Sequence, residues 1–330
     1  MAWRIHFTAE DLARTRVSAS LGPLAETLFG LSLLRCSRRR PAAFSGWRDH
    51  ARGRLTADLR PLVDVVPLEA GGVDLLTLTG EAPTIEHGIE ALLAMPRERV
   101  LAELEFSSRD GGVASSAWSL ADRDTAARKQ LARAARAAYR TLVEPHWARV
   151  STHLQAERAA RGRMVLEGGV ERLLATLHPP RMRWRLPVLE VLGGGEMDLH
   201  LDGRGLVLIP SVFVGTVPVL LQDLTDETAP PRLIFPVAMD PAVAVRLWGE
   251  PEPGGRALAA LVGRTRAAVL SRIADGCTTS EIARHIGISP AAASQHATVL
   301  RDAGLITTRR QGGAVLHALT RLGVELLEGR

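Results

Sequence analysis

The last quarter of the chain is divided by closely spaced helix start and stop signals, which limit it to short helices joined by tight turns. A first helix is expected over residues 263–275, where apolar side chains recur at helical spacing and Gly276 follows as a stop signal. A second is expected over residues 280–287, with Thr279 as its N-cap and Gly287 as the turn that ends it. The segment therefore predicts two short helices in close succession.

A third helix is expected to follow at once. Ser289 is an apparent N-cap, and Pro290 fits the first helical position, where a missing N–H costs nothing. One buried stripe is expected at i, i+4 and i+7 before Gly304 ends the helix, and it is formed by Ala293, Ala297 and Leu300. Two helices joined by a turn of a few residues, with a small residue at the turn, form a helix-turn-helix arrangement.

A hairpin is predicted after the third helix. Residues 305–310 and 314–320 alternate like two strands around a glycine turn, and Arg309 and Arg310 stand beside its tip. The order helix, helix, helix, hairpin, helix is that of a winged helix-turn-helix domain. The wording SEIARHIGISPAAASQHATVLRDAGLITTRRQGGAVLHALT closely resembles the ArsR family of bacterial transcription regulators, and the resemblance covers about residues 256–330.

The resemblance implies a cytoplasmic homodimer that binds an inverted-repeat operator in double-stranded DNA and represses until a signal releases it. Many relatives bind metals through paired thiolates in the helix before the recognition helix, or through Asp and His pairs in the last helix. Here residues 280–287 contain no cysteine, Cys277 stands alone, and the closing residues 320–330 contain no histidine. We therefore expect no metal site and no cofactor, and we expect Cys277 to be a small buried residue.

The third helix should present a small, polar outer face to the major groove. The positions away from its buried stripe are Ser289, Ala291, Ala292, Ser294, Gln295, Thr298 and Arg301. Gln295 and Ser294 are expected to contact base edges, while Arg301, Arg309 and Arg310 are expected to contact phosphates or the minor groove. His296 lies beside this face, and it either contacts DNA or forms a hydrogen bond within the fold.

The charge distribution agrees with a nucleic-acid partner at the C-terminal end. Residues 254–330 hold ten arginines and five acidic residues, so they carry the whole net charge of +5. The only two cysteines cannot make a disulfide framework, and the first ten residues carry charges where a secretory signal needs an apolar segment. The longest uncharged stretch, residues 205–221, is interrupted by prolines and glycine, so no membrane anchor is expected. A cytoplasmic protein fits these observations best.

The main domain boundary is expected at residues 250–255, where prolines and glycines are concentrated. Before it, residues 1–250 predict a helix-rich domain, helical to about residue 178 and strand-rich over residues 181–238. An α+β class follows, with a small antiparallel sheet packed on helices and a winged helix over residues 256–330. The first part resembles the uncharacterised domains fused ahead of ArsR-type winged helices in some bacterial regulators, a similarity that implies no chemistry.

Three functions remain open at this point. The favoured one is a regulator whose N-terminal part senses a small molecule or extends the dimer interface. The second is an enzyme acting on a metabolite under the control of the winged helix, which is disfavoured because no P-loop, dinucleotide fingerprint, HExxH or GxSxG motif is present. The third is a winged helix that binds protein instead of DNA. His146 and His153 lie seven residues apart on one helical segment, too far to share a metal ion without other ligands.

Overall fold

The computed structural model describes residues 2–35, 41–52, 54, 57–66, 73–109, 113–122, 125–178, 181–193, 195–249, 258, 261–273, 277–286, 288–311 and 314–328. The chain divides into two compact units. The first comprises Met1–Ser37 and Arg54–Val237, and the second comprises Arg38–Gly53 and Ala238–Arg330. The boundary predicted at residues 250–255 lies outside the described residues. Because a short segment near residue 45 belongs to the second unit, the chain passes between the units three times.

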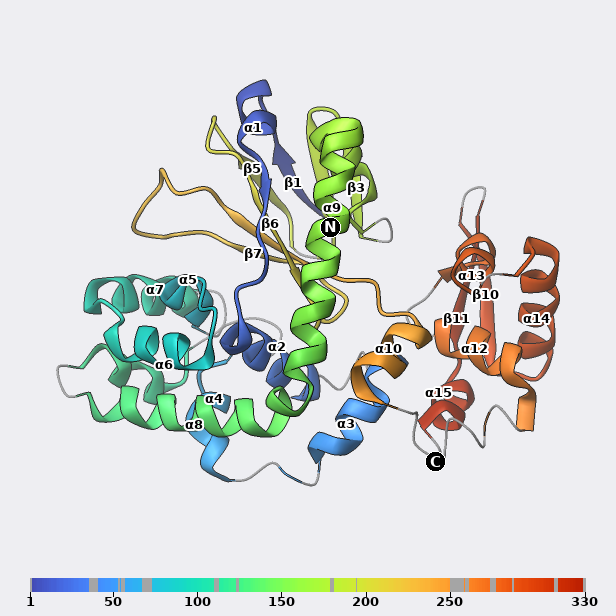
Figure 1. Cartoon of the computed structure of the whole chain (residues 1–330), viewed down its shortest axis with the longest axis horizontal. Coiled ribbons are helices and arrows are strands. Elements are labelled where there is room, and N and C mark those ends of the chain that lie inside the picture. The colour runs from blue at the N-terminus through green and yellow to red at the C-terminus, as the bar shows by residue number, and fades with distance from the viewer. Residues whose placement is uncertain are drawn as a thin grey trace. The chain divides into compact units, whose positions relative to one another are not determined.

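The first unit contains two four-stranded sheets (Figure 1). Their strand orders are β3 (Met182–Arg185), β4 (Val188–Leu192), β1 (Ala2–His6), β5 (Met197–His200), and β2 (Arg16–Val17), β6 (Val207–Ser211), β8 (Arg232–Pro236), β7 (Val219–Leu221). Both are mixed, since β1 runs antiparallel to β4 and parallel to β5, and β8 runs parallel to β6 and antiparallel to β7. The predicted α+β class is confirmed, but two mixed sheets stand where we expected one small antiparallel sheet.

Each sheet takes a strand from the first 17 residues, a stretch that we expected to be helical. In β1 the side chains alternate, so that Ile5 is buried and Trp3 packs against the core, while Arg4 is exposed and His6 is partly exposed. The strand ends at His6, and the ring of the next residue, Phe7, meets Trp184 of β3 edge to face. Strand β1 has only five residues, and it is followed at once by the helix start at Thr8 and Asp11. An apolar alternation this short is too weak to predict a strand beside such a helix signal.

Helix α1 (Ala9–Arg14) begins where its capping box predicts. The Asp11 amide donates to the Thr8 hydroxyl at 3.2 Å, and the Thr8 amide donates to the Asp11 carboxylate at 2.8 Å. Asp11 is fully buried, and it also accepts a hydrogen bond of 2.9 Å from the Gly205 amide, ahead of β6. Asp11 of this capping box therefore also connects α1 to the segment just before β6, 194 residues later in the sequence.

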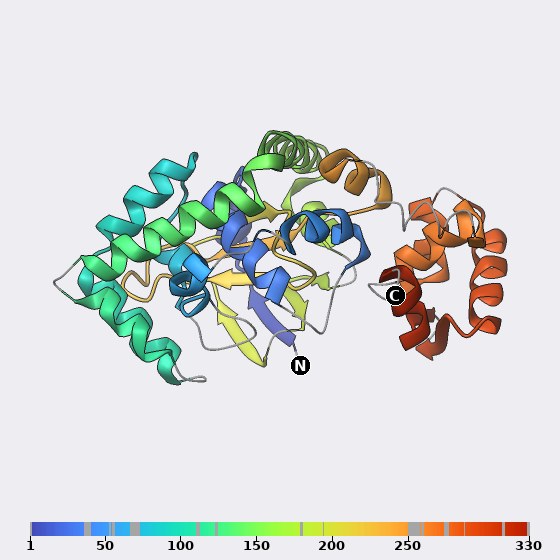
Figure 2. The ribbon, with the colours of Figure 1, turned by 90° about the horizontal axis from the view of Figure 1, so that it is seen from below.

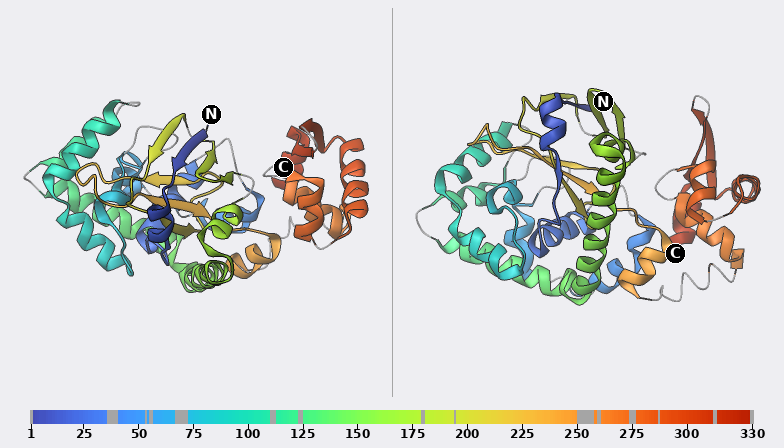
Figure 3. Two further views of the ribbon diagram at one scale, coloured as in Figure 1. Left: turned by 90° about the horizontal axis from the view of Figure 1, so that it is seen from above. Right: turned by 45° about the horizontal axis from the view of Figure 1, so that its top comes forward.

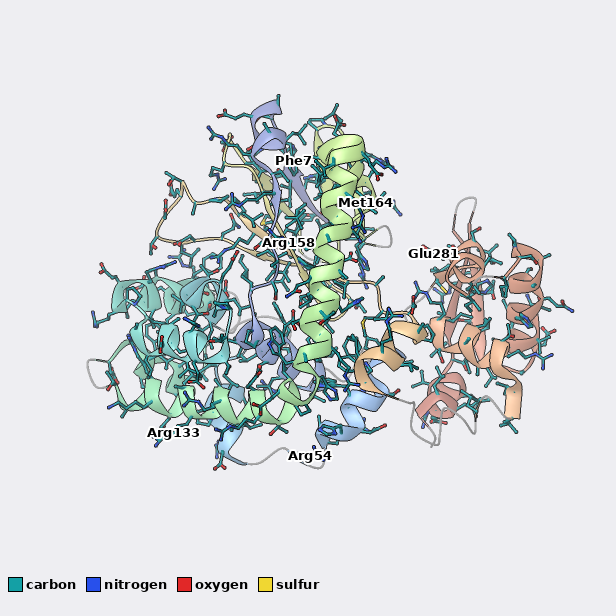
Figure 4. The ribbon with its side chains drawn as sticks, viewed as in Figure 1. Phe7, Arg54, Arg133, Arg158, Met164 and Glu281 are labelled. Atoms are coloured by element: carbon teal, nitrogen blue, oxygen red, sulfur yellow. The ribbon has the colours of Figure 1, made fainter. Side chains whose placement is uncertain are left out.

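Helix α9 (Glu144–Thr176) reverses direction at Gly169, whose φ of 72° and ψ of 179° are not helical. Arg161, before the reversal, donates to the carbonyl oxygens of Thr176 and Leu177 at 3.0 and 3.4 Å. These partners lie 15 and 16 residues away and could not be reached in a straight helix. Met164 marks the segment before the reversal in Figure 4. The final turns can thus pack on the sheets.

One hydrophobic core of the first unit lies between both sheets and the end of α9. It contains Ile5, Phe7, Leu173, Leu174, Leu177, Met182, Leu189, Val191, Leu199, Leu201, Leu206, Leu208, Leu233 and Phe235. Burial of this many large apolar side chains is the main force that holds the strands together. The predicted strand-rich region, residues 181–238, is confirmed as the source of β3 to β8.

The remaining helices of the first unit gather to one side of the sheets (Figure 2). They are α2 (Pro23–Arg35), α4 (Arg60–Val63), α5 (Leu75–Thr79), α6 (Ile85–Ala94), α7 (Arg97–Arg109) and α8 (Ala126–Leu142), with the 3₁₀ turns η2 (Ala57–Leu59) and η3 (Ser115–Ala121). Helix α2 packs against α6 and α8. It is buried on almost every side, including its acidic residue Glu26.

The second unit consists of η1 (Ala42–Phe44), α3 (Ser45–Arg52), α10 (Pro241–Trp248), α12 (Arg264–Ile273), β9 (Cys277–Thr278), α13 (Thr279–Ile286), α14 (Pro290–Asp302), β10 (Ile306–Gln311), β11 (Ala314–Leu319) and α15 (Arg321–Glu328). The order of elements from α12 onward is the one predicted for a winged helix. Its strands form an antiparallel sheet in the order β10, β11, β9.

An aromatic cluster joins the early segment of the chain to α10. The Trp248 indole donates to the Ala43 carbonyl at 2.7 Å, and its ring lies 5.7 Å from Phe44 and 6.4 Å from Trp47 between centroids. Helix α12 contacts both η1 and α10. Residues 41–52 are therefore part of the same packed body as the first helix of the winged helix.

Within the described part of the chain, no helix is both long enough and apolar enough to span a membrane.

Candidate nucleic-acid interface

Helix α13 starts with a capping box formed by Thr278 and Glu281. The Thr278 amide donates to the Glu281 carboxylate at 2.7 Å, and the Glu281 amide donates to the Thr278 hydroxyl at 3.3 Å. Glu281 is labelled in Figure 4. We expected Thr279 to be the cap, so the cap lies one residue earlier than predicted. The spacing of Thr278 and Glu281 carries the capping-box signal, and the Thr279 hydroxyl is free to bond elsewhere.

Helix α14 begins and ends where its sequence signals predict. The Ala292 amide donates to the Ser289 hydroxyl at 3.1 Å, and Pro290 occupies the first turn. The predicted stripe of Ala293, Ala297 and Leu300 is buried. After the helix, Gly304 adopts a φ of 71°, a conformation that favours glycine. Both ends of the helix are thus fixed by local chemistry.

The side chains predicted to read DNA are mostly exposed on α14. Ser289, Ala291, Ser294, Gln295, Thr298 and Arg301 are exposed, while Ala292 and His296 are half-buried. With about 100° of rotation per residue, Gln295 lies roughly opposite the buried stripe. Small uncharged side chains surround Gln295, so nothing bulky would prevent the helix from entering a major groove.

For His296 the sequence left open either a DNA contact or a hydrogen bond within the fold. Its Nδ1 atom is buried and has no hydrogen-bond partner among the described residues. The ring therefore makes no internal hydrogen bond through this nitrogen, and its contribution to DNA contact stays a prediction.

Two residues near the end of α14, Val299 and Asp302, were not among the DNA contacts that we predicted. The Arg301 guanidinium pairs with the Asp302 carboxylate at 3.1 Å, and both side chains are about half exposed. An exposed pair of this kind contributes little to stability, but the carboxylate offsets positive charge at this end of the helix. Val299 is also exposed, at 40%.

The wing is the hairpin formed by β10 and β11, which extends from the helices of its own unit (Figure 3). Pairing runs from Ile306 opposite Leu319 to Gln311 opposite Ala314. Arg309 is exposed on β10. The side chain of Arg310 lies outside the described atoms, so its predicted contact is not placed.

His317 of β11 is a functional candidate that we did not predict. Its ring is 4% exposed, and its two nitrogens form hydrogen bonds to the hydroxyl groups of Thr279 and Thr308. Burial lowers its pKa, and the nearby charge of Arg301 lowers it further. A single histidine in a strand pattern gives no sequence signal for such a bridge.

An exposed polar cluster lies on β1 and β5 of the first unit. Asp198 accepts hydrogen bonds from Arg4 at 2.8 and 2.6 Å and pairs with His6 at 2.8 Å, and the rings of His6 and His200 stack at 4.3 Å. The hydrogen bonds from Arg4 and His6 hold the pKa of Asp198 well below its usual range. Cross-strand pairs of this type stabilise a solvated sheet face.

A search for metal ligands in the described part of the chain finds no cluster of three or more His, Cys, Asp or Glu side chains able to hold an ion. Cys277 is 1% exposed, which confirms the predicted burial, and its thiol lies 3.7 Å from the Arg272 carbonyl.

Comparison with known protein families gives a match in the C-terminal part of the chain. A family model described as a helix-turn-helix domain matches residues 264–309, from the start of α12 to within β10. The chain carries a helix-turn-helix domain. A domain of this class indicates DNA binding and transcription regulation in general terms. Searches of curated proteins and of solved structures found no match.

Proposed function

We propose that the chain is a sequence-specific transcription regulator of the ArsR type, and that it binds double-stranded DNA through α14 and the wing. One observation carries the proposal: a capped helix in a helix-turn-helix domain presents an exposed face that is centred on Gln295 and is uncharged over residues 289–300. A face of this size and polarity fits the major groove, where base edges differ in their donors and acceptors.

Specificity and affinity come from different residues in this proposal. Gln295 can pair with adenine through two hydrogen bonds, and Ser294 contacts a neighbouring base edge. Arg309 and Arg310 contact phosphates or the minor groove from the wing. Arg301 contacts a phosphate only by sharing its guanidinium with Asp302, so we expect it to contribute less than Arg309.

The proposed binding form is a homodimer on an inverted-repeat operator. The two reading helices would lie about 34–36 Å apart, one turn of DNA. Apolar side chains are available for such an interface: Leu322 of α15 is 54% exposed, and Leu261, ahead of α12 in the sequence, is 75% exposed. Leu326 and Leu327 instead pack against the core of their own winged helix. Helix α15 can therefore serve both its own domain and a partner.

The proposed mode of action is repression that ends when the first unit binds a small-molecule effector. Such a ligand acts only if it binds one dimer geometry more tightly than the other. Residues 41–52 offer a connection, because they follow the first unit in sequence and pack in the second unit against α12. A shift of this segment would therefore move α12, the first helix of the winged helix, against which it packs.

The proposal assigns no catalytic activity to the chain and places it in the cytoplasm. The first unit contributes neither a catalytic motif nor, in its described residues, a metal-ligand cluster. Its role here is recognition of the effector and support of the dimer.

A mobility-shift experiment with the full chain and DNA from its own promoter region tests the proposal. The expected result is a shifted complex that competitor DNA of scrambled sequence does not displace. Gln295→Ala should lose discrimination between the two DNAs, and Glu90→Gln, an exposed change on α6 of the first unit, is the matched control.

Failure to shift any duplex DNA would refute the proposal. Capture of a protein by the second unit without DNA binding would favour the winged helix as a protein-interaction module. Turnover in a metabolite screen would instead favour the enzyme.

A further inference from the structure

The inference concerns His317, which lies at the junction of the wing and the helix-turn-helix. In the sheet, His317 of β11 pairs with Thr308 of β10 on one side and with Cys277 of β9 on the other. Its side chain is 4% exposed. The imidazole is therefore enclosed in the domain, on the strand of the wing that pairs with the strand of Arg309.

Both nitrogens of the ring are engaged. Nε2 lies 2.9 Å from the Thr279 hydroxyl oxygen, and Nδ1 lies 3.0 Å from the Thr308 hydroxyl oxygen. A neutral imidazole has one donor and one acceptor nitrogen, and a hydroxyl group can complement either. Both bonds can therefore form at once in either tautomer. Burial, which lowers the pKa of His317, keeps the ring in this neutral form.

The two partners belong to the two parts of the domain that face DNA. Thr279 is the first residue of α13, directly after the Thr278–Glu281 capping box. Thr308 immediately precedes Arg309 on the wing. The same ring thus connects the start of the helix-turn-helix to the strand that carries the proposed phosphate contact.

We propose that His317 is the positioning residue that sets the wing relative to the helix-turn-helix, so that Arg309 reaches a phosphate while α14 occupies the groove. The inference rests on the proposed DNA binding. The His317 ring is rigid, and its two nitrogens fix the directions of the hydrogen bonds to Thr279 and Thr308. Without it the hairpin keeps its own ladder and the pairing of β11 with β9, but it loses the side-chain hydrogen bond to Thr279 at the start of α13.

An ordinary buried histidine would behave differently. If His317 only filled space and satisfied two hydroxyl groups, its loss would lower stability and weaken DNA binding in general, but the contribution of Arg309 would persist. If His317 positions the wing, its loss should remove the contribution of Arg309 selectively. Salt dependence measures that contribution, because each phosphate contact adds about 0.9 to the slope of log affinity against log salt concentration.

The experiment is a double-mutant cycle on the full chain with a DNA fragment selected by the parent protein. Arg309→Ala is made in the parent, in His317→Phe, and in Thr307→Val. His317→Phe keeps an aromatic ring at this position, although a larger one, and removes both hydrogen bonds. Thr307→Val is the matched control, since Thr307 neighbours Thr308 on β10 but is exposed and does not touch His317.

We expect Arg309→Ala to lower the salt slope by about 0.9 in the parent and in Thr307→Val, and to leave it unchanged in His317→Phe. The double variant Thr279→Val with Thr308→Val keeps the imidazole and should reproduce the His317→Phe result, which covers the case in which His317→Phe does not fold. Thermal unfolding of each variant shows which ones are folded.

An Arg309→Ala effect that persists in His317→Phe, or in the double threonine variant, overturns the inference while leaving DNA binding intact. An Arg309→Ala effect absent from the parent also overturns it, because there is then no wing contact to position. A parent chain without salt-dependent DNA binding would instead refute the proposed function.

Discussion

Replacing Glu26 with glutamine should change how the stability of the first unit depends on pH. Glu26 is 1% exposed, and burial raises its pKa from 4.5 to about 7. The Phe213 amide and the Ser211 hydroxyl donate to its carboxylate at 2.9 and 3.1 Å, which opposes the shift without cancelling it. Glutamine has nearly the same shape and keeps one acceptor oxygen, but it does not titrate.

The magnitude follows from linkage. A rise in pKa from 4.5 to about 7 corresponds to about 3.4 kcal/mol. Because the folded pKa lies above the unfolded one, the folded state holds the proton more tightly, and this contribution to stability is fully present below about pH 4.5 and lost as the pH rises through about 7. Between about pH 5 and about pH 8 the parent should lose about 2.5 kcal/mol relative to Glu26→Gln.

Urea unfolding of the full chain at both pH values, followed by a signal from the first unit, measures this difference. Glu90→Gln is the control, because Glu90 is exposed on α6, and its profile should follow that of the parent. Parallel pH profiles for the parent and Glu26→Gln would refute the reasoning, since they would mean that Glu26 binds protons equally well in the folded and unfolded chain.

Three further predictions concern the second unit. Gln295→Ala should cost about 1–3 kcal/mol at one operator position, and equal discrimination by the parent and the variant in binding titrations would contradict it. Ser289→Ala should cost about 1 kcal/mol of stability in thermal unfolding, because the Ala292 amide loses its acceptor, whereas an unchanged midpoint would mean that the cap is replaced. Leu322→Glu should give a monomer by light scattering while the fold is kept, with Arg321→Gln as the exposed neighbouring control, and a persisting dimer would exclude this face of α15.

The winged helix could be predicted from the sequence because its elements are specified by neighbouring residues. Ser289, Pro290 and Gly304 act on their own helix within one turn, and Ala293, Ala297 and Leu300 repeat at a spacing that only one helix face satisfies. The displaced cap at Thr278 shows the limit of this approach. Two adjacent threonines offer the same hydroxyl, and only the position of Glu281 distinguishes them.

The sheets of the first unit could be predicted only in part, because their pairing joins distant segments. The strands after residue 181 contain short apolar runs bounded by turn residues, which are visible locally. Strand β1 instead pairs with β4 and β5, nearly 190 residues away, and nothing within β1 indicates those partners. Its register is decided by which face is buried, a property of the whole fold.

The residues of the candidate site also differ in whether local sequence could predict them. Exposure of Gln295 follows from helix periodicity, so the sequence could point to it. The bridge from His317 to Thr279 and Thr308 joins three elements at 9 and 38 residues of separation, and no periodicity connects them. Asp302 was not among the predicted contacts, although its carboxylate pairs with Arg301.

The early aromatic segment has a practical consequence for dissecting this protein. A fragment beginning in the Pro/Gly-rich stretch near residue 250 would retain α12 but lose Phe44, Trp47 and Trp248, which bury one another beside it. Such a truncation would expose apolar surface of α12, the first helix of the winged helix, that is covered in the full chain. A separated winged helix therefore has to include residues 41–52 and α10 if this apolar surface is to stay covered.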